Sequence, residues 1–343
     1  MKNNNILKIG SGVINDISST LSKSGIKGKL LYVSDPVVDK LYGDVVKAQL
    51  KDIGKVKEES VDYNTISYSM SVAERVIATD IDCIIGIGGG KVLDVCKYAA
   101  HISKKPFLSI PTTMANDGIC SPIAVLKRQD NKPKSLGCQM PSMLLLDTEL
   151  ILNGPQALIK AGIGDTISNY SALIDWKFAC DRNMDEMNGY AYMMSKNSLD
   201  ALMKTQYNSI GPDFIEVLAN SLVLSGVAMD FAGSSRPVSG SEHLFSHALD
   251  YYSKNQNLHG IQVALGTVAM LMLINEDYTD VINYLKRFEV DINPKNLEID
   301  EETFVYCMQN AASMRTNRYT HLNEVDLSTE KVKKVYKKLI EEV

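Results

Sequence analysis

The chain has 343 residues, 45% of them hydrophobic, and a formal net charge of -5. This length favours two domains, and the composition is that of an ordinary globular protein, which excludes a fibrous or disordered one. The acidic balance argues against partners bound through a basic surface, so we expect binding neither to nucleic acid nor to an anionic membrane.

The cysteines and the N-terminal residues indicate the redox compartment in which the protein is expected to work. The six cysteines are scattered without a C-x-x-C motif, and "MKNNNILKIG" lacks the apolar core of a signal peptide. We therefore expect free thiols in a reducing cytoplasm. The most apolar window, residues 261–274, is too short to cross a bilayer and predicts a buried core helix.

In chain order, residues 1–150 alternate short β-rich runs with segments of helical periodicity. Strand character appears at 29–36, 55–63, 83–87, 106–113 and 142–148, with helical patterns after residue 36, at 67–79 and after the glycines near residue 90. Such alternation predicts a parallel sheet with helices on both faces.

The stretch "CIIGIGGGKVLDVCKYAA" places four glycines in five positions between an apolar strand and a helix. Glycines let backbone N–H groups approach a ligand closely, and a helix N-terminus favours phosphate. The Rossmann fingerprint would need a glycine at Lys91, and the Walker A pattern one at Ile85. A tight turn without ligand therefore stays open. Ligands of parallel sheets bind at the carboxyl ends of strands, where Asp35, Thr112 and Thr113 also fall.

From about residue 150 onward, strand signals nearly vanish and long amphipathic runs take over. We therefore divide the chain into an α/β domain at residues 1–150 and an all-α domain at residues 151–343.

Three of the five histidines fall within 17 residues in the second half. His243 and His247 are four apart, which places them on one helix face, and His259 precedes the next apolar helix. Histidine is the commonest transition-metal ligand, and three protein ligands with an open position suit a catalytic zinc. Asp165 is the natural carboxylate partner, although a helix N-cap explains it equally well.

Five segments together resemble a known family: "GIGGGKVLDVCKYAA", "SIPTTMANDGICSPIAV", "GIGDTISNYSALIDWKFA", "SGSEHLFSHALDYY" and "LHGIQVALGT". They are similar, in order, to signature segments of the glycerol dehydrogenase branch of the iron-containing alcohol dehydrogenase superfamily, nearest to the sn-glycerol-1-phosphate dehydrogenases. The resemblance implies a Rossmann-like dinucleotide domain followed by an all-helical metal domain, the dehydroquinate synthase-like fold, and a role in phospholipid biosynthesis.

The resemblance also implies site residues. The metal ligands would be Asp165, His243 and His259, with Asp117 and His247 as catalytic groups beside the substrate. The dinucleotide would contact a longer set: Asp35, Gly88, Gly89, Gly90, Asp94, Thr112 and Thr113. A carboxylate at position 35 would accept ribose hydroxyls and repel a 2′-phosphate, so NAD is expected ahead of NADP. Zinc is expected, with nickel and ferrous iron as alternatives.

The substrate is expected to be a small polyol or polyol phosphate, and copies of the chain are expected to form a homo-oligomer. A phosphate would need a cation, for which Arg236, seven residues before His243, is the candidate; a solvated surface arginine is the other interpretation. Three alternatives stay open: a glycerol dehydrogenase, a cyclase of the dehydroquinate synthase type, and a nucleotide-binding regulatory protein with a vestigial metal site.

Overall fold

A computed structural model describes residues 6–343; residues 1–5, the start of the stretch inspected for a signal peptide, lie outside the described residues. The chain forms two compact units. The first contains the elements β1 (Ile6–Gly10), η1 (Val13–Asp16), α1 (Ile17–Lys23), β2 (Gly28–Ser34), α2 (Pro36–Lys51), β3 (Gly54–Ser60), α3 (Ile66–Ala78), β4 (Cys83–Gly88), α4 (Gly90–Ser103), β5 (Phe107–Pro111), β6 (Ile123–Lys127), β7 (Pro133–Gly137), β8 (Met143–Asp147) and α5 (Thr148–Leu152).

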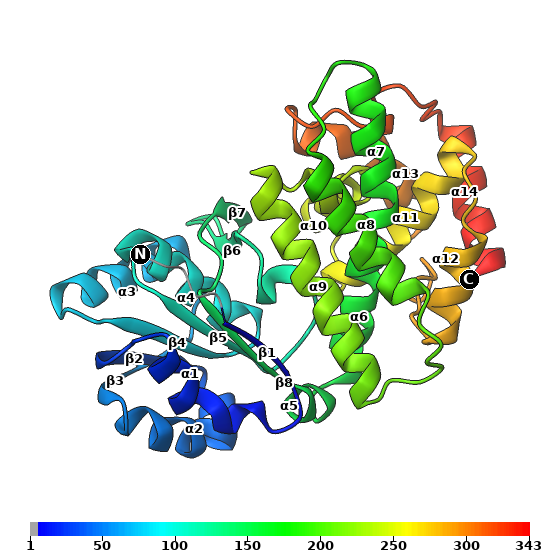
Figure 1. The fold of residues 1–343 in the computed structure, drawn as a ribbon. Helices are drawn as coiled ribbons and strands as arrows, with labels where there is room; N and C mark the ends of the chain where they lie inside the picture. Colours follow the sequence, from blue (N-terminus) through cyan, green and yellow to red (C-terminus); the bar gives the residue numbers. More distant parts are fainter. Residues whose placement is uncertain (1–5) are drawn as a thin grey trace. The chain divides into compact units, whose positions relative to one another are not determined.

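Six strands of the first unit form one parallel sheet in the order β1-β8-β5-β4-β2-β3. Every residue of β4, β5 and β8 is buried, as expected for central strands with helices on both faces. Figure 1 shows α1 and α2 on one face of the sheet and α3 and α4 on the other. The predicted α/β class is confirmed.

One hydrophobic core joins the sheet to α1 and α2. Alternate residues of the central strands, such as Ile85 and Ile87 of β4, point to this face and pack against Leu21 and Leu50. The antiparallel hairpin β6–β7 stands apart from the sheet. The order β5-β4-β2 makes the ends of these strands neighbours, so the segments after them lie together at one edge.

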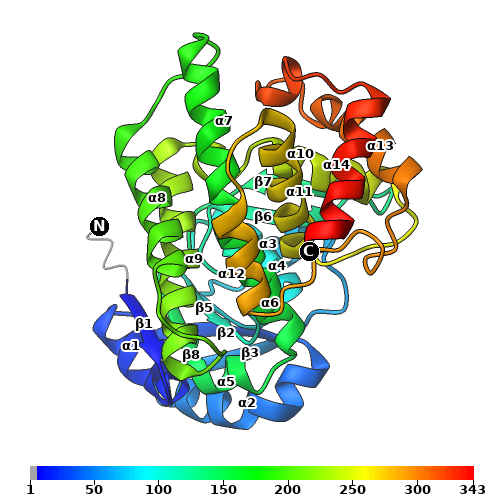
Figure 2. The ribbon, with the colours of Figure 1, turned by 90° about the vertical axis from the view of Figure 1, so that its right-hand side faces the viewer.

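The second unit is helical. Its elements are η2 (Asp117–Ile119), which begins in this unit, then α6 (Gln156–Ile167), α7 (Asn169–Asp181), α8 (Gly189–Met203), α9 (Pro212–Ala232), η3 (Arg236–Val238), α10 (Ser241–Tyr252), α11 (His259–Ile274), α12 (Thr279–Arg287), α13 (Glu301–Asn310), η4 (Ala311–Met314), η5 (His321–Asn323) and α14 (Thr329–Glu342). Fourteen residues of α11 are buried, and this helix lies among α6, α10 and α14 (Figure 2). The apolar window at 261–274 is thus a core helix.

The division between the units differs in detail from the predicted boundary at residue 150. The first unit extends to Pro155 and also includes Gly211–Ala219, whereas Ala115–Asp117 belongs to the second unit. The stretch 211–219 returns because it lies beside β1: Glu216 Oε1 is 3.7 Å from where a Cβ on Gly10 would stand.

Helix α9, which crosses from one unit into the other, is the one described helix long and apolar enough to span a membrane by length and composition. Of its most apolar 18-residue window, 61% is buried inside the protein. Side chains such as Phe214 and Leu222 are at most 1% exposed, so most of α9 packs as a core helix.

Candidate functional site

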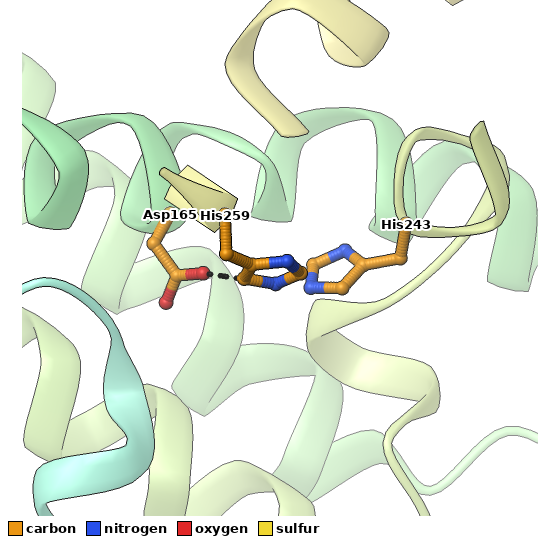
Figure 3. Close-up of side chains that lie close together, drawn as sticks. All are labelled: Asp165, His243 and His259. Carbon is orange, nitrogen blue, oxygen red and sulfur yellow. Dashed lines mark ion pairs between the residues drawn. The ribbon is translucent and has the colours of Figure 1, made fainter. Parts of the chain in front are cut away.

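Three helices of the second unit bring Asp165, His243 and His259 together. Asp165 lies in the last turn of α6, His243 in the first turn of α10, and His259 begins α11. One ligand atom from each residue lies within 4.8 Å of the others, and Asp165 Oδ1 is 3.7 Å from His259 Nε2. Figure 3 shows the carboxylate of Asp165 facing the ring of His259, which in turn faces His243.

Small residues allow this convergence. A Cβ on Gly164 would stand 2.2 Å from the carbonyl oxygen of Gly260, and a Cβ on Gly260 would stand 1.9 Å from that of Ala161. Backbone distances this short mean that α6 and α11 cross in contact, with glycine at the crossing on both helices. Each glycine is next in sequence to a candidate ligand, so the close crossing sets the separation of Asp165 and His259.

Buried polar groups orient both histidines. Glu242 Oε1 lies 2.8 Å from His243 Nδ1, and when this carboxylate is ionised it accepts the Nδ1–H. Ser246 donates to Gln262 Oε1 at 2.7 Å and lies 3.2 Å from His259 Nδ1, so its oxygen accepts from that nitrogen. With Glu242 ionised, both interactions leave the Nε2 lone pairs free, which is the arrangement that histidine ligands of metals adopt.

Partial burial keeps the histidines neutral: the side chains of His243 and His259 are 13% and 33% exposed. Desolvation lowers the pKa of His259 to about 3, and it lowers the pKa of His243 to about 3 with the positive charges of Arg315 and Arg318 acting in the same direction. Neutral imidazole is the form that binds a metal, so these side chains are ready as ligands at neutral pH.

Asp165 is a buried acid in an unfavourable environment. Desolvation raises its pKa well above the usual range, and the neighbouring negative charge of Asp117 raises it further. The backbone N–H of Asp117 donates to Asp165 Oδ2 at 2.9 Å and opposes this shift. The alternative of a helix N-cap is wrong, because Asp165 stands in the last turn of α6.

The three side chains fit a divalent cation. Two neutral imidazoles and one carboxylate match the donor set of catalytic zinc, and the ion would offset the charge that makes Asp165 costly to ionise. Donor atoms around a tetrahedral ion lie roughly 3.4 Å apart for bonds of about 2.1 Å. The spread of up to 4.8 Å therefore requires a small inward rotation of the side chains.

His247 lies one turn after His243 on the same helix, α10. Desolvation lowers its pKa to about 3. Asp117 reaches the centre through its backbone bond to Asp165. The two residues predicted to act beside the substrate thus both adjoin the candidate metal centre.

The glycine turn of the first unit joins β4 to α4. Gly89 precedes α4 and Gly90 begins it, and a Cβ on Gly90 would meet no atom within 4 Å. Thr113 Oγ1 is 3.2 Å from the Cβ position of Gly89, and the backbone N–H of Thr112 donates to Gly88 O at 3.0 Å. An open helix N-terminus of this kind accepts a phosphate group.

Asp35 and Asp94 have structural partners beside this turn. Asp35 caps α2, with Oδ1 accepting the backbone N–H groups of Val37 and Val38 at 2.9 and 3.0 Å. Asp94 Oδ1 lies 3.4 Å from the ammonium of Lys97, a fully buried lysine. Among residues 6–343, Oδ2 of Asp35 accepts no hydrogen bond, so one oxygen rather than two is open to a ribose.

Arg236 differs from both interpretations of the sequence. Only 4% of its surface is exposed, its Nε pairs with the carboxylate of Asp185, and Nη1 donates to the carbonyl of Tyr319 at 2.6 Å. The interpretation as a solvated surface arginine is wrong, and the expectation of a phosphate ligand needs correction, because this guanidinium is buried and bound to protein partners.

Sequence reasoning missed three residues next to the centre: Glu242, Arg315 and Arg318. Glu242 directly precedes His243, and an acid beside a ligand histidine was the available signal. The two arginines stand more than 50 residues after the last of the three histidines, in "SMRTNRYTH", where no pattern links them to the histidines.

Comparisons with known proteins agree with this architecture. Residues 8–155 match the family described as iron-containing alcohol dehydrogenase. The chain is 34% identical over 325 residues to a glycerol-1-phosphate dehydrogenase (NAD(P)+) of Hyperthermus butylicus, covering 94% of this chain and 93% of that protein. It is 35% identical over 328 residues to the protein of the same name from Aeropyrum pernix, covering 94% and 92%.

Solved structures share the fold at lower identity. Glycerol dehydrogenase of Schizosaccharomyces pombe has a TM-score of 0.78 at 17% identity, over 98% of this chain and 89% of that one. Maleylacetate reductase of Agrobacterium tumefaciens has a TM-score of 0.75 at 15% identity, over 100% and 98%.

Proposed function

Because the chain belongs to the glycerol-1-phosphate dehydrogenase family, within the iron-containing alcohol dehydrogenases, we propose that it interconverts sn-glycerol 1-phosphate and dihydroxyacetone phosphate with NAD or NADP. The observation that carries the proposal is the convergence of Asp165, His243 and His259 within 4.8 Å in a chain with such relatives. Glycerol dehydrogenase activity on dihydroxyacetone is the second candidate, favoured by the shared fold.

Each residue of the candidate metal centre has a proposed role. Asp165, His243 and His259 would hold a divalent cation, with zinc preferred over nickel or ferrous iron because two imidazoles and one carboxylate match the donor set of catalytic zinc. When bound, the cation supplies Lewis acidity to a carbonyl or hydroxyl oxygen. Nicotinamide, when bound, supplies or accepts the hydride. The neutral His247 can exchange a hydrogen bond, and then a proton, with the reacting hydroxyl. The Asp117 N–H fixes Asp165 in position.

The glycine turn is proposed to bind the dinucleotide pyrophosphate through Gly88, Gly89 and Gly90, with Thr112 and Thr113 alongside. Asp35 Oδ2 is free to accept a hydrogen bond from a ribose hydroxyl, which favours NAD. Asp94, which lies in α4 beside Lys97, belongs to the same proposed dinucleotide site. Association into a homo-oligomer and a cytoplasmic location stay predictions; the six free cysteines are compatible with a reducing compartment.

A test of the function compares substrates. The zinc-loaded protein is assayed by NADH oxidation with dihydroxyacetone phosphate and with dihydroxyacetone, and again with NADPH. We expect dihydroxyacetone phosphate to be reduced with the higher kcat/KM and NADH to be preferred. Faster reduction of dihydroxyacetone would support the second candidate, and turnover with neither ketone would contradict both.

A further inference from the structure

Two arginines of the second unit converge on one serine next to α10. Arg318 Nη2 donates to Ser235 Oγ at 2.8 Å, and Arg315 Nη1 donates to the same oxygen at 3.2 Å. Arg318 Nη1 also donates to the carbonyl of Ser239 at 2.8 Å. Ser239 stands two residues before α10 begins, so the guanidinium pair is anchored to the segment that leads into the helix of His243.

The pair lies close to the candidate metal centre. Arg315 directly follows η4, and η4 packs against α10. Arg318 holds the carbonyl of Ser239, just before α10. Both guanidinium groups are therefore attached to the surroundings of the helix that begins with Ser241 and carries His243.

The charges of this pair are only partly balanced. Arg318 is 9% exposed, yet among residues 6–343 neither Arg315 nor Arg318 has a carboxylate oxygen within 4.0 Å. Their neighbour Arg236 is paired with Asp185. Buried cations nearly always have an anionic partner, and here Glu242 and Asp185 act on Arg318 only from a distance. Burial, and after it the positive charges of Arg236 and Arg315, lower the pKa of Arg318 to about 10.

We propose that Arg315, oriented by Ser235 and reinforced by the charge of Arg318, binds the phosphate group of the substrate. This inference rests on the proposed function, since it assumes a phosphorylated triol or ketone. Arg315 is half-buried and donates one of its five N–H groups to Ser235. The other N–H groups of the planar guanidinium remain to donate to two phosphate oxygens. The reacting oxygen and the phosphate are opposite ends of the substrate, so they require separate partners: the metal centre for the first and Arg315 for the second.

The test compares Arg315→Ala and Arg315→Lys with the wild type in the zinc-loaded protein. For Arg315→Ala we expect kcat/KM for dihydroxyacetone phosphate to fall about 10- to 150-fold, mainly through KM. Activity on unphosphorylated dihydroxyacetone is expected to stay within twofold, and Arg315→Lys to recover part of the loss by keeping the charge. Arg128→Ala, which removes an exposed arginine of the β6–β7 turn, is the matched control. This variant is expected to leave kcat/KM unchanged for both substrates.

Binding of inorganic phosphate, measured by calorimetry on the same proteins, separates this inference from the function itself. Should the wild type not reduce dihydroxyacetone phosphate, the proposed function fails, while phosphate binding that disappears in Arg315→Ala still upholds the anion site. Equal losses on both ketones, or loss of zinc from Arg315→Ala and Arg315→Lys, would assign the arginine to the metal centre and overturn the inference. Unchanged kinetics together with unchanged phosphate binding would overturn it as well.

Discussion

At the scale of single residues, the two histidines of α10 are expected to have different tasks. His243 lies within 4.8 Å of the other ligand atoms and is oriented by Glu242, whereas His247 stands one turn further on. We expect His243→Ala to abolish both zinc binding and activity, because two remaining ligands hold zinc weakly. His247→Ala is expected to retain zinc and to lose about 10²- to 10⁴-fold in kcat, the usual contribution of a group that transfers a proton.

Elemental analysis of the purified, untagged variants, alongside kcat at saturating substrate, distinguishes the two residues. His101, a histidine of α4 in the first unit, provides the matched control: His101→Ala is expected to keep both zinc and kcat. Loss of zinc from His247→Ala with retention by His243→Ala would reverse the assignment.

The residue scale also marks the limit of sequence reasoning. The sequence predicted the metal ligands Asp165, His243 and His259 because their residue types and their family-like segments can be read directly from it. The structure places the three side chains together. Arg236 was expected to bind phosphate because its segment leads into the helix of His243, whereas it pairs with Asp185, 51 residues away in the chain. Long-range pairing of this kind leaves no local pattern.

At the scale of elements, the crossing of α6 and α11 determines where two ligands stand. Gly260→Ala would place a methyl group 1.9 Å from the backbone carbonyl of Ala161, so the helices must separate. We expect a loss of about 1–3 kcal/mol in the free energy of unfolding, as in overpacked cores. Zinc affinity is expected to fall at least about 10-fold, because displaced helices no longer hold Asp165 and His259 at ligand separation.

Urea unfolding and a competitive zinc titration measure the two effects. Gly189→Ala is the control: Gly189 begins α8, and a methyl group there would meet no atom within 4 Å. Its stability is expected to stay constant or rise slightly, with unchanged zinc affinity. If Gly260→Ala bound zinc as tightly as the wild type, the crossing would not be what positions the ligands.

Elements were predictable where the chain carries periodic patterns. The alternation of strands and helices predicted the parallel sheet, since β4, β5 and β8 are buried throughout and mostly apolar. The strand β1 and the hairpin β6–β7 were not predicted. Each of these strands has five residues and is partly exposed, so backbone pairing rather than a hydrophobic pattern specifies them.

At the scale of the whole molecule, the buried centre links stability to pH in the metal-free protein. In the folded state His243, His247 and His259 have pKa values near 3, below the 6.5 of an exposed histidine. Their neutral form is therefore favoured by folding, and stability falls as pH drops below 6.5, where the unfolded chain takes up protons. Each such group changes the free energy of unfolding by about 1.4 kcal/mol per pH unit.

The buried acids act in the opposite direction. Desolvation raises the pKa of Glu242 to about 8 and that of Asp165 well above its usual range, so both hold protons in the folded state at pH values where the unfolded chain has lost them. These two acids stabilise the folded state fully at pH values below the pKa that each has in the unfolded chain. This stabilisation is lost as pH rises toward the higher pKa that each has in the folded state. With three histidines limiting stability on the acidic side and two acids on the alkaline side, we expect metal-free protein to be most stable near pH 6.5.

Bound zinc changes the alkaline side of this profile, because a cation beside Asp165 and Glu242 favours their ionised forms. We expect the decline between pH 6.5 and 8 to disappear in zinc-loaded protein, so that stabilisation by zinc grows with pH. Urea unfolding of both forms across pH 5.5 to 8 tests this. In metal-free Asp165→Asn, which removes one of the two acids, the alkaline decline should be about half as steep. A metal-free protein whose stability rises steadily from pH 6.5 to 8 would contradict the assignment, since Asp165 and Glu242 would then be ionised without a cation.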